Sequence, residues 1–131
     1  MDRIVKTDAQ WQQQLSAEQY RVLRNKGTER AFSGSHWQTD KPGTYRCAGC
    51  DLSLFAAGTK FDSGSGWPSF SAPVNDDHVE LRSDEGFGMV RIEVLCGRCG
   101  GHLGHVFDDG PAPTGQRFCI NSVSLRHVPE G

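Results

Sequence analysis

Four of the five cysteines stand in two matched pairs, and their spacing constrains the fold more than any other feature of the chain. The pairs are Cys47-Ala-Gly-Cys50 and Cys96-Gly-Arg-Cys99, with residues 51–95 between them. A C-x2-C turn directs two thiolates at one ion, and two such turns complete the tetrahedral shell that zinc favours. The sequence therefore predicts one structural zinc ion per chain. Two local disulfides, an iron–sulfur site and coincidence are the alternatives.

Size and composition predict a single domain made mainly of strands. The chain has 131 residues, and 16 of them are glycine, which favours turns and short strands over long helices. Its 14 basic and 16 acidic residues argue against binding to nucleic acid through phosphate contacts. The sequence shows neither the apolar run of a membrane helix nor the apolar core of a secretory signal. We therefore expect a cytoplasmic protein without nucleic-acid or membrane partners.

The first 26 residues are polar and predict a short helical segment. Ser16 and Gln19 have the spacing of a capping box, so a helix is expected over residues 17–26, ending at Gly27. A shorter helix is expected over residues 8–14.

From residue 43 onward the pattern changes to strands and turns. Within residues 88–96, Val90, Ile92 and Val94 alternate with Met89, Arg91 and Glu93, which is the period of a strand. Further strands are expected at residues 44–46, 79–82, 105–107 and 117–125. The predicted fold is mainly β and antiparallel, with a β core at residues 43–125 after a helical lead-in at residues 1–26.

The fifth cysteine, Cys119, is the candidate for chemistry. If residues 117–125 form a strand, Arg117 and Asn121 flank Cys119 on one face. A guanidinium there favours the thiolate and lowers the thiol pKa, and an asparagine can hold a bound polar group. The alternative is an inert buried thiol.

Three further motifs supply candidate site residues. His102 and His105 follow the second cysteine pair and could act as general acids or hydrogen-bond donors; a fifth metal ligand and surface histidines are the alternatives. Trp67 stands in a Gly/Pro loop, where it is either a packing anchor or one wall of an apolar pocket. Asp109 could orient a histidine or pair with Arg117.

Taken together, these motifs resemble the methionine sulfoxide reductase B family. The segments GWPSF, the two CxxC pairs, GHLGHVF, DGPAPTG and RFCIN occur in the family's order between residues 41 and 125. The resemblance implies two antiparallel sheets pinned by the four-cysteine zinc site, in one reductase domain over residues 1–131. It implies an active site on a face distant from the metal. It also implies reduction of methionine-R-sulfoxide in peptides and proteins, which repairs oxidative damage.

The resemblance also assigns roles to the candidate residues. Cys119 resembles the family nucleophile, which becomes a sulfenic acid, and Arg117 resembles its electrostatic partner. The residues that hold or protonate the sulfoxide oxygen are matched by His102, His105 and Asn121. Trp67 matches the aromatic wall that receives the methyl group, and Asp109 matches an acidic position near the substrate.

One position departs from the family pattern. Many members carry a recycling cysteine two residues before the tryptophan, where this chain has Ser65. The resemblance otherwise accounts for all five cysteines, so none remains to resolve the sulfenic acid. The expected partner is therefore an external thiol reductant such as thioredoxin. The chain itself is expected to be a monomer.

Two other classes of protein compete with a reductase. A zinc-pinned β domain can act as a binding module, but such a module does not need Cys119 beside Arg117. A hydrolase with a Cys/His pair would form an acyl-enzyme and would need no reductant.

Overall fold

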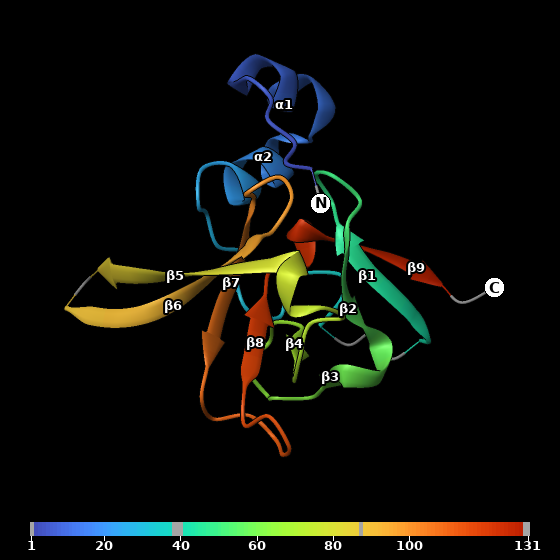
Figure 1. Cartoon of the computed structure of the whole chain (residues 1–131), viewed down its shortest axis with the longest axis vertical. Helices are drawn as coiled ribbons and strands as arrows, with labels where there is room; N and C mark the ends of the chain where they lie inside the picture. Colours follow the sequence, from blue (N-terminus) through green and yellow to red (C-terminus); the bar gives the residue numbers. More distant parts are fainter. Residues whose placement is uncertain (1, 38–40, 87, 130–131) are drawn as a thin grey trace.

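The computed structural model describes residues 2–37, 41–86 and 88–129, and it confirms the predicted fold class. The described residues form two antiparallel sheets and two short α-helices. The helices lie together at one end of the molecule, and the hairpin of strands β5 (Val79–Gly86) and β6 (Met89–Cys96) projects to one side (Figure 1). None of the helices among the described residues is long and apolar enough to cross a membrane.

The smaller sheet joins strands from both ends of the β region. Its order is β2-β1-β9, with β1 at Gly43–Cys47, β2 at Ser53–Ala56 and β9 at Leu125–Pro129. The described strands therefore reach Pro129, four residues beyond the predicted end of the core.

The larger sheet has the order β3-β4-β8-β7-β6-β5. Its strands are β3 Lys60–Phe61, β4 Ser69–Phe70, β5 Val79–Gly86, β6 Met89–Cys96, β7 His102–Phe107 and β8 Arg117–Ile120. Three 3-10 helices connect the elements: η1 Ala57–Thr59, η2 Asp76–His78 and η3 Ser122–Ser124.

Both helices begin with local signals that the sequence carries. Helix α1, Asp8–Gln14, and helix α2, Ala17–Leu23, each start with a complete capping box. The predicted end of α2 at residue 26 is wrong. Lys26 has a φ of 58°, which is left-handed, so the chain leaves the helical path before Gly27.

The single strand predicted over residues 117–125 is also wrong. Strand β8 ends at Ile120, and the chain passes through η3 into β9, which belongs to the other sheet. The backbone N–H of Asn121 donates to the Leu103 carbonyl, and the Ser124 N–H donates to the Asn121 carbonyl. The first bond ties the chain to β7, and the second closes the turn that directs it into β9.

Aromatic side chains fill the space between the sheets. Phe55 of β2 stacks on Phe70 of β4 with ring centroids 4.4 Å apart. Tyr45 of β1 and Phe118 of β8 complete the group, at 5.1 Å from Phe70 and 5.7 Å from Phe55. All four are buried. This packing fixes β4 and β8, the strands that carry the site described below.

The apolar residues of β6 are buried only at the end of the strand that lies next to the core. Val94 is fully buried, whereas Val90 is 70% exposed at the tip of the projecting hairpin. On the opposite face of the strand, Glu93 is buried.

Candidate functional site

The two cysteine pairs meet at one point beside the helices. The four sulfur atoms of Cys47, Cys50, Cys96 and Cys99 lie within 4.8 Å of one another. The Sγ atoms of Cys47 and Cys99 are 3.7 Å apart, and those of Cys50 and Cys96 are 3.4 Å apart. Each of these short sulfur–sulfur distances thus joins one pair to the other. All five cysteines are free of disulfide bonds.

This cluster could hold a metal ion. Zinc–sulfur bonds of about 2.3 Å in a tetrahedron place the sulfurs about 3.8 Å apart, close to the separations found here. Neighbouring groups also orient the two turns. Arg24 Nη1 donates to the Cys99 carbonyl at 2.9 Å, and the Arg98 guanidinium donates to the Cys50 carbonyl. The donor set and its geometry therefore fit a closed, structural tetrahedral site.

Cys119 lies on one face of the larger sheet. It pairs with Ser69 of β4 on one side and with His105 of β7 on the other. His105 in turn pairs with Glu93 of β6. Directly paired residues of antiparallel strands point to the same face. These four side chains therefore share a face.

A cavity of about 320 Å³ opens over this face. Its lining includes Cys119 and four of the other predicted site residues, whereas His102 and Asp109 do not line it. The full lining is Thr28, Ser65, Trp67, Arg91, His105, Phe107, Arg117, Cys119 and Asn121. None of these residues belongs to the cysteine cluster, of which Cys47 and Cys50 line a separate surface hollow.

A register shift brings the two histidines to the same face. Residues three apart in a regular strand face opposite sides of the sheet, which would separate His102 from His105. The β6–β7 pairing shifts between Val94 and Leu95, so Leu103 is the extra residue on β7. The two imidazoles lie with ring centroids 5.6 Å apart.

Each histidine is held by its own carboxylate. The distance between His105 Nε2 and Asp84 Oδ2 is 2.9 Å, and that between His102 Nδ1 and Glu93 Oε2 is 2.7 Å. Lys26 Nζ lies 3.5 Å from Asp84 and 3.3 Å from Glu93, so it bridges the two carboxylates. The two carboxylates fix the orientation of both imidazole rings. Asp84 contacts His105 through Nε2, so Nδ1 of His105 takes no part in that contact.

The environments of the two histidines differ. His102 is 2% exposed, and burial lowers its pKa, although the hydrogen bond to Glu93 opposes that effect. His102 Nε2 has no hydrogen-bond partner among the described residues. His105 is partly exposed and lines the cavity.

Arg117 pairs with Asp109 rather than reaching a histidine-bound carboxylate. Its Nε lies 2.9 Å from Asp109 Oδ1 and its Nη2 lies 3.2 Å from Oδ2, while its guanidinium covers the Phe107 ring at 4.5 Å. The Arg117 hydrogen bond lowers the pKa of Asp109. Asp109 thus holds Arg117 at the cavity edge.

The expectation of a lowered Cys119 pKa is wrong. Burial raises the pKa of the Cys119 thiol, and this outweighs the opposing effects of the Ser65 hydroxyl and the Arg117 charge. Desolvation disfavours the thiolate more than one partly shared guanidinium favours it. Ser65 Oγ lies 4.0 Å from Cys119 Sγ.

The segment after α2 holds two of the lining residues. Trp67 Nε1 donates to the Glu29 carbonyl at 3.0 Å, and the Glu29 N–H donates to Asn121 Oδ1 at 2.9 Å. Asn121 Nδ2 donates to the Leu103 carbonyl at 3.0 Å. The Trp67 indole and the Asn121 carboxamide are therefore fixed by the same residue.

Comparison with known proteins places the chain in a family. A family model described as "SelR domain" matches residues 15–129. The chain belongs to the SelR domain family. Relatives that are more than half identical to this chain are named for methionine sulfoxide reduction, so the resemblance that the sequence motifs indicate is confirmed.

This SelR domain is similar to curated proteins named "Peptide methionine sulfoxide reductase MsrB". The protein of that name from Thiobacillus denitrificans is 58% identical over 125 residues, 95% of this chain and 95% of that protein. The one from Leptospira interrogans is 55% identical over 125 residues, again 95% of each chain. The one from Methanosarcina barkeri is 54% identical over 127 residues, 97% of this chain and 89% of that protein.

Sequence reasoning missed several residues of the SelR domain site. The charged groups around the histidines are Lys26, Asp84 and Glu93, and two further cavity walls are Thr28 and Arg91. Arg91 and Glu93 lie on β6, in the alternating pattern of residues 88–96. Charged residues in such a pattern are typical of the exposed face of a strand, so the sequence did not single them out. Phe107 also lines the cavity, and it could have been found from the sequence because it ends the motif GHLGHVF, which contains both histidines.

Proposed function

We propose that this chain is a peptide-methionine (R)-S-oxide reductase that repairs oxidised methionine in peptides and proteins. One observation carries the proposal. Cys119, the only cysteine outside the metal cluster in the sequence, opens into a cavity with an aromatic wall and a histidine held by a carboxylate. The names of relatives that are more than half identical to this chain support the same activity.

The proposed reaction transfers one oxygen atom. The Cys119 sulfur attacks the sulfoxide sulfur while a proton reaches the sulfoxide oxygen. The attack forms a bond between the two sulfurs. As the sulfur–oxygen bond of the substrate breaks, the oxygen passes to the Cys119 sulfur and the sulfur–sulfur bond breaks, which leaves methionine and a sulfenic acid on Cys119. The methionine sulfur gains the two electrons that the Cys119 sulfur loses. A first reducing thiol later displaces the oxygen as water and forms a mixed disulfide with Cys119, and a second thiol breaks that disulfide and restores the Cys119 thiol.

We assign the proton to His105 because it lines the cavity with Asp84 behind it. His102 lies behind His105 as a buried positioning residue. Asn121 donates a hydrogen bond to the sulfoxide oxygen, and Arg117, held by Asp109, stabilises charge on Cys119. Because burial raises the pKa of Cys119, the thiolate is disfavoured at neutral pH. The positive charge of Arg117 and the polar sulfoxide group of the substrate must therefore help the Cys119 sulfur to attack.

Selectivity for one epimer follows from the two kinds of wall. Trp67 and Phe107 give the cavity an apolar side that suits the methyl group, and His105 and Asn121 give it a polar side that suits the oxygen. In the wrong epimer, the oxygen would face the aromatic rings without a hydrogen bond, at a cost of about 2 kcal/mol or more.

We propose that the cysteine cluster holds one zinc ion with a structural role. All four ligand positions are taken by Cys47, Cys50, Cys96 and Cys99, which suits a closed site. The ion would fix the turns after β1 and β6, and no catalytic step passes through it.

We also propose one monomeric domain over residues 1–131, in the cytoplasm. Unpaired cysteines suit a reducing compartment. Because Ser65 replaces a recycling thiol, a thioredoxin-like protein or small thiol reduces Cys119 directly.

The test is a dithiothreitol-dependent assay with each epimer of a methionine sulfoxide peptide. We expect turnover of the R epimer, essentially none of the S epimer, and none by Cys119→Ser. Trp67→Ala should weaken use of the R epimer far more than it lowers the melting temperature. Comparable turnover of both epimers, or an active Cys119→Ser protein, would refute the proposal.

Without reductant, the zinc-loaded chain should form about one methionine per chain and lose only the Cys119 thiol. A probe for sulfenic acids should label that residue. Release of zinc with an internal disulfide would contradict this part of the proposal.

A further inference from the structure

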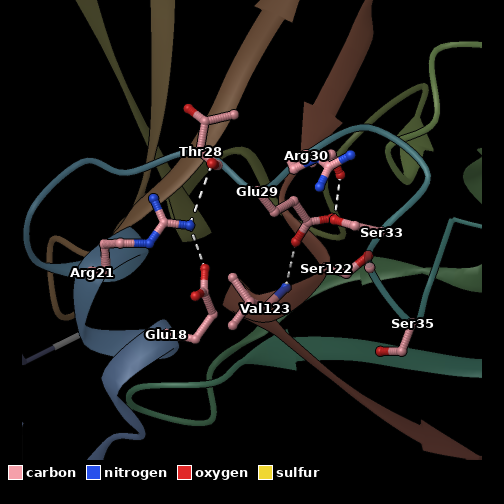
Figure 2. Close-up of a pocket in the computed structure, with 10 residues that line it drawn as sticks. Glu18, Arg21, Thr28, Glu29, Arg30, Ser33, Ser35, Ser122 and Val123 are labelled. Atoms are coloured by element: carbon pink, nitrogen blue, oxygen red, sulfur yellow. Dashed lines mark hydrogen bonds and ion pairs between the residues drawn. The ribbon is translucent and has the colours of Figure 1, made fainter.

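A second cavity adjoins the Cys119 cavity and shares one wall with it. Its volume is about 610 Å³, and it lies between α2, the segment at residues 28–35 and η3 (Figure 2). Thr28 lines both cavities. The neighbouring Glu29 lines this second cavity, while its backbone contacts two residues of the Cys119 cavity. Glu29 is therefore part of the partition between the two.

Glu29 makes three hydrogen bonds to other described residues, and each reaches a different part of the site. Its carbonyl accepts from Trp67 Nε1, and its N–H donates to Asn121 Oδ1. Its side-chain Oε1 accepts from the Val123 N–H at 2.9 Å (Figure 2). The side chain thus ties residue 29 to the turn between the two sheets, and the backbone then holds the indole and the carboxamide.

The burial of this carboxyl group needs a reason other than stability. Glu29 is 6% exposed, and its Oε2 has no hydrogen-bond partner among the described residues. Burying a polar oxygen without a partner is unfavourable. An apolar side chain would avoid that cost, but it could not accept the Val123 N–H.

The Glu29 N–H also decides which way the Asn121 carboxamide faces. Because Oδ1 accepts from Glu29, Nδ2 must point the other way, where one of its hydrogens goes to Leu103. The second hydrogen of Nδ2 is available to the cavity that Asn121 lines. A flipped amide would present an acceptor to the sulfoxide oxygen and repel it.

We infer that Glu29 is a positioning residue that sets the Trp67 wall and the Asn121 donor together for the R sulfoxide. The inference rests on the proposed function. Displacing either group by about 1 Å can lower the rate about a hundredfold. Loss of the Glu29 side chain should therefore affect epimer selectivity as well as rate.

The test compares Glu29→Ala with Glu29→Gln and with Glu18→Ala. The glutamine keeps an oxygen that accepts the Val123 N–H. Glu18 is exposed, lines the same cavity and pairs with Arg21, so its removal is the matched control. Measurements are kcat and KM for both epimers, thermal melting, and hydrogen exchange of the Trp67 indole N–H by NMR.

For Glu29→Ala we expect kcat/KM for the R epimer to fall about a hundredfold. The R over S preference should also fall, and the indole N–H should exchange faster. Glu29→Gln should recover most of the loss, and Glu18→Ala should match the wild type. In combination with Trp67→Phe, which removes the indole donor, the effects of Glu29→Ala should be less than additive.

Two results would overturn the inference. One is a folded Glu29→Ala protein with wild-type selectivity and indole exchange; the other is full additivity with Trp67→Phe. If Glu29→Ala does not fold, Trp67→Phe tests the same bond from its other end, and wild-type KM and selectivity there would refute it. A wild-type chain that reduces neither epimer would refute the proposed function, while the indole exchange would still decide whether Glu29 holds Trp67.

Discussion

Replacing Ser65 by cysteine should give this chain the internal recycling step that its sequence lacks. Ser65 Oγ already lies 4.0 Å from Cys119 Sγ, and the two residues are 54 positions apart in the sequence. The turn is held in place by bonds from Ser63 to Ser65 and to Ser69 of β4. A thiol at position 65 is therefore within reach of the sulfenic acid on Cys119.

The size of the stabilisation can be worked from the loop that the new bond would close. A cross-link between residues 54 apart removes conformational entropy from the unfolded chain, which raises the free energy of the unfolded state by about 4 kcal/mol at 25 °C. Loss of the Ser65 hydroxyl and its bond to Ser63 offsets about 1 kcal/mol. The net gain of about 3 kcal/mol corresponds to a rise of about 10 °C in melting temperature for a chain of this size.

The assay is a single turnover without reductant, followed by thiol counting, peptide mapping and melting. Ser65→Cys should form about one methionine per chain, lose two thiols and link positions 65 and 119. The matched control, Ser65→Ala, should lose only the Cys119 thiol and keep its sulfenic acid. A Ser65→Cys protein that loses one thiol, or that links the new thiol to a metal ligand, would refute the assigned geometry.

The remaining predictions concern the metal and pH. Cys96→Ser should lose bound zinc and melt at a lower temperature, because metal binding stabilises only the folded state; a full equivalent of tightly bound zinc with an unchanged melt would contradict the assignment. Burial raises the folded-state pKa of Cys119, so its contribution to stability is complete below the unfolded thiol pKa of about 8.5 and is lost as pH rises through the folded value. Alkylation of Cys119 against pH should show a midpoint above the ordinary thiol value, higher still in Arg117→Met, and a midpoint below it would contradict the burial argument.

Several features of the fold could be predicted because their signals are local. The capping box of Ser16 and Gln19 starts a helix within four residues, and the alternation of residues 88–96 gives strand β6 almost to its ends. The end of α2 and the break after β8 could not be predicted in this way. The end of α2 is set by the left-handed conformation of Lys26, which the helical pattern does not specify, and the chain after β8 is held by a distant segment through the bond from the Asn121 N–H to the Leu103 carbonyl.

The candidate site divides along the same line. The motif around Cys119 indicated three of the cavity's residues, Arg117, Cys119 and Asn121, since neighbours at a spacing of two on a strand share a face. Two other motifs indicated Trp67 and His105. The proximity of His102 to His105 required a register shift that only the pairing of β6 with β7 supplies. The role of Glu29 depends on Asn121, which is 92 residues away in the sequence.

The sequence by itself determined the fold class, the family and the identity of the four cysteines that could hold a metal ion. These follow from residue types at fixed local spacings, which act through backbone geometry and covalent reach. The tertiary structure alone decided the direction of the Cys119 pKa shift and the carboxylate partners of the histidines. Desolvation and hydrogen-bond geometry depend on which distant segments cover a side chain, and no spacing within a motif specifies that.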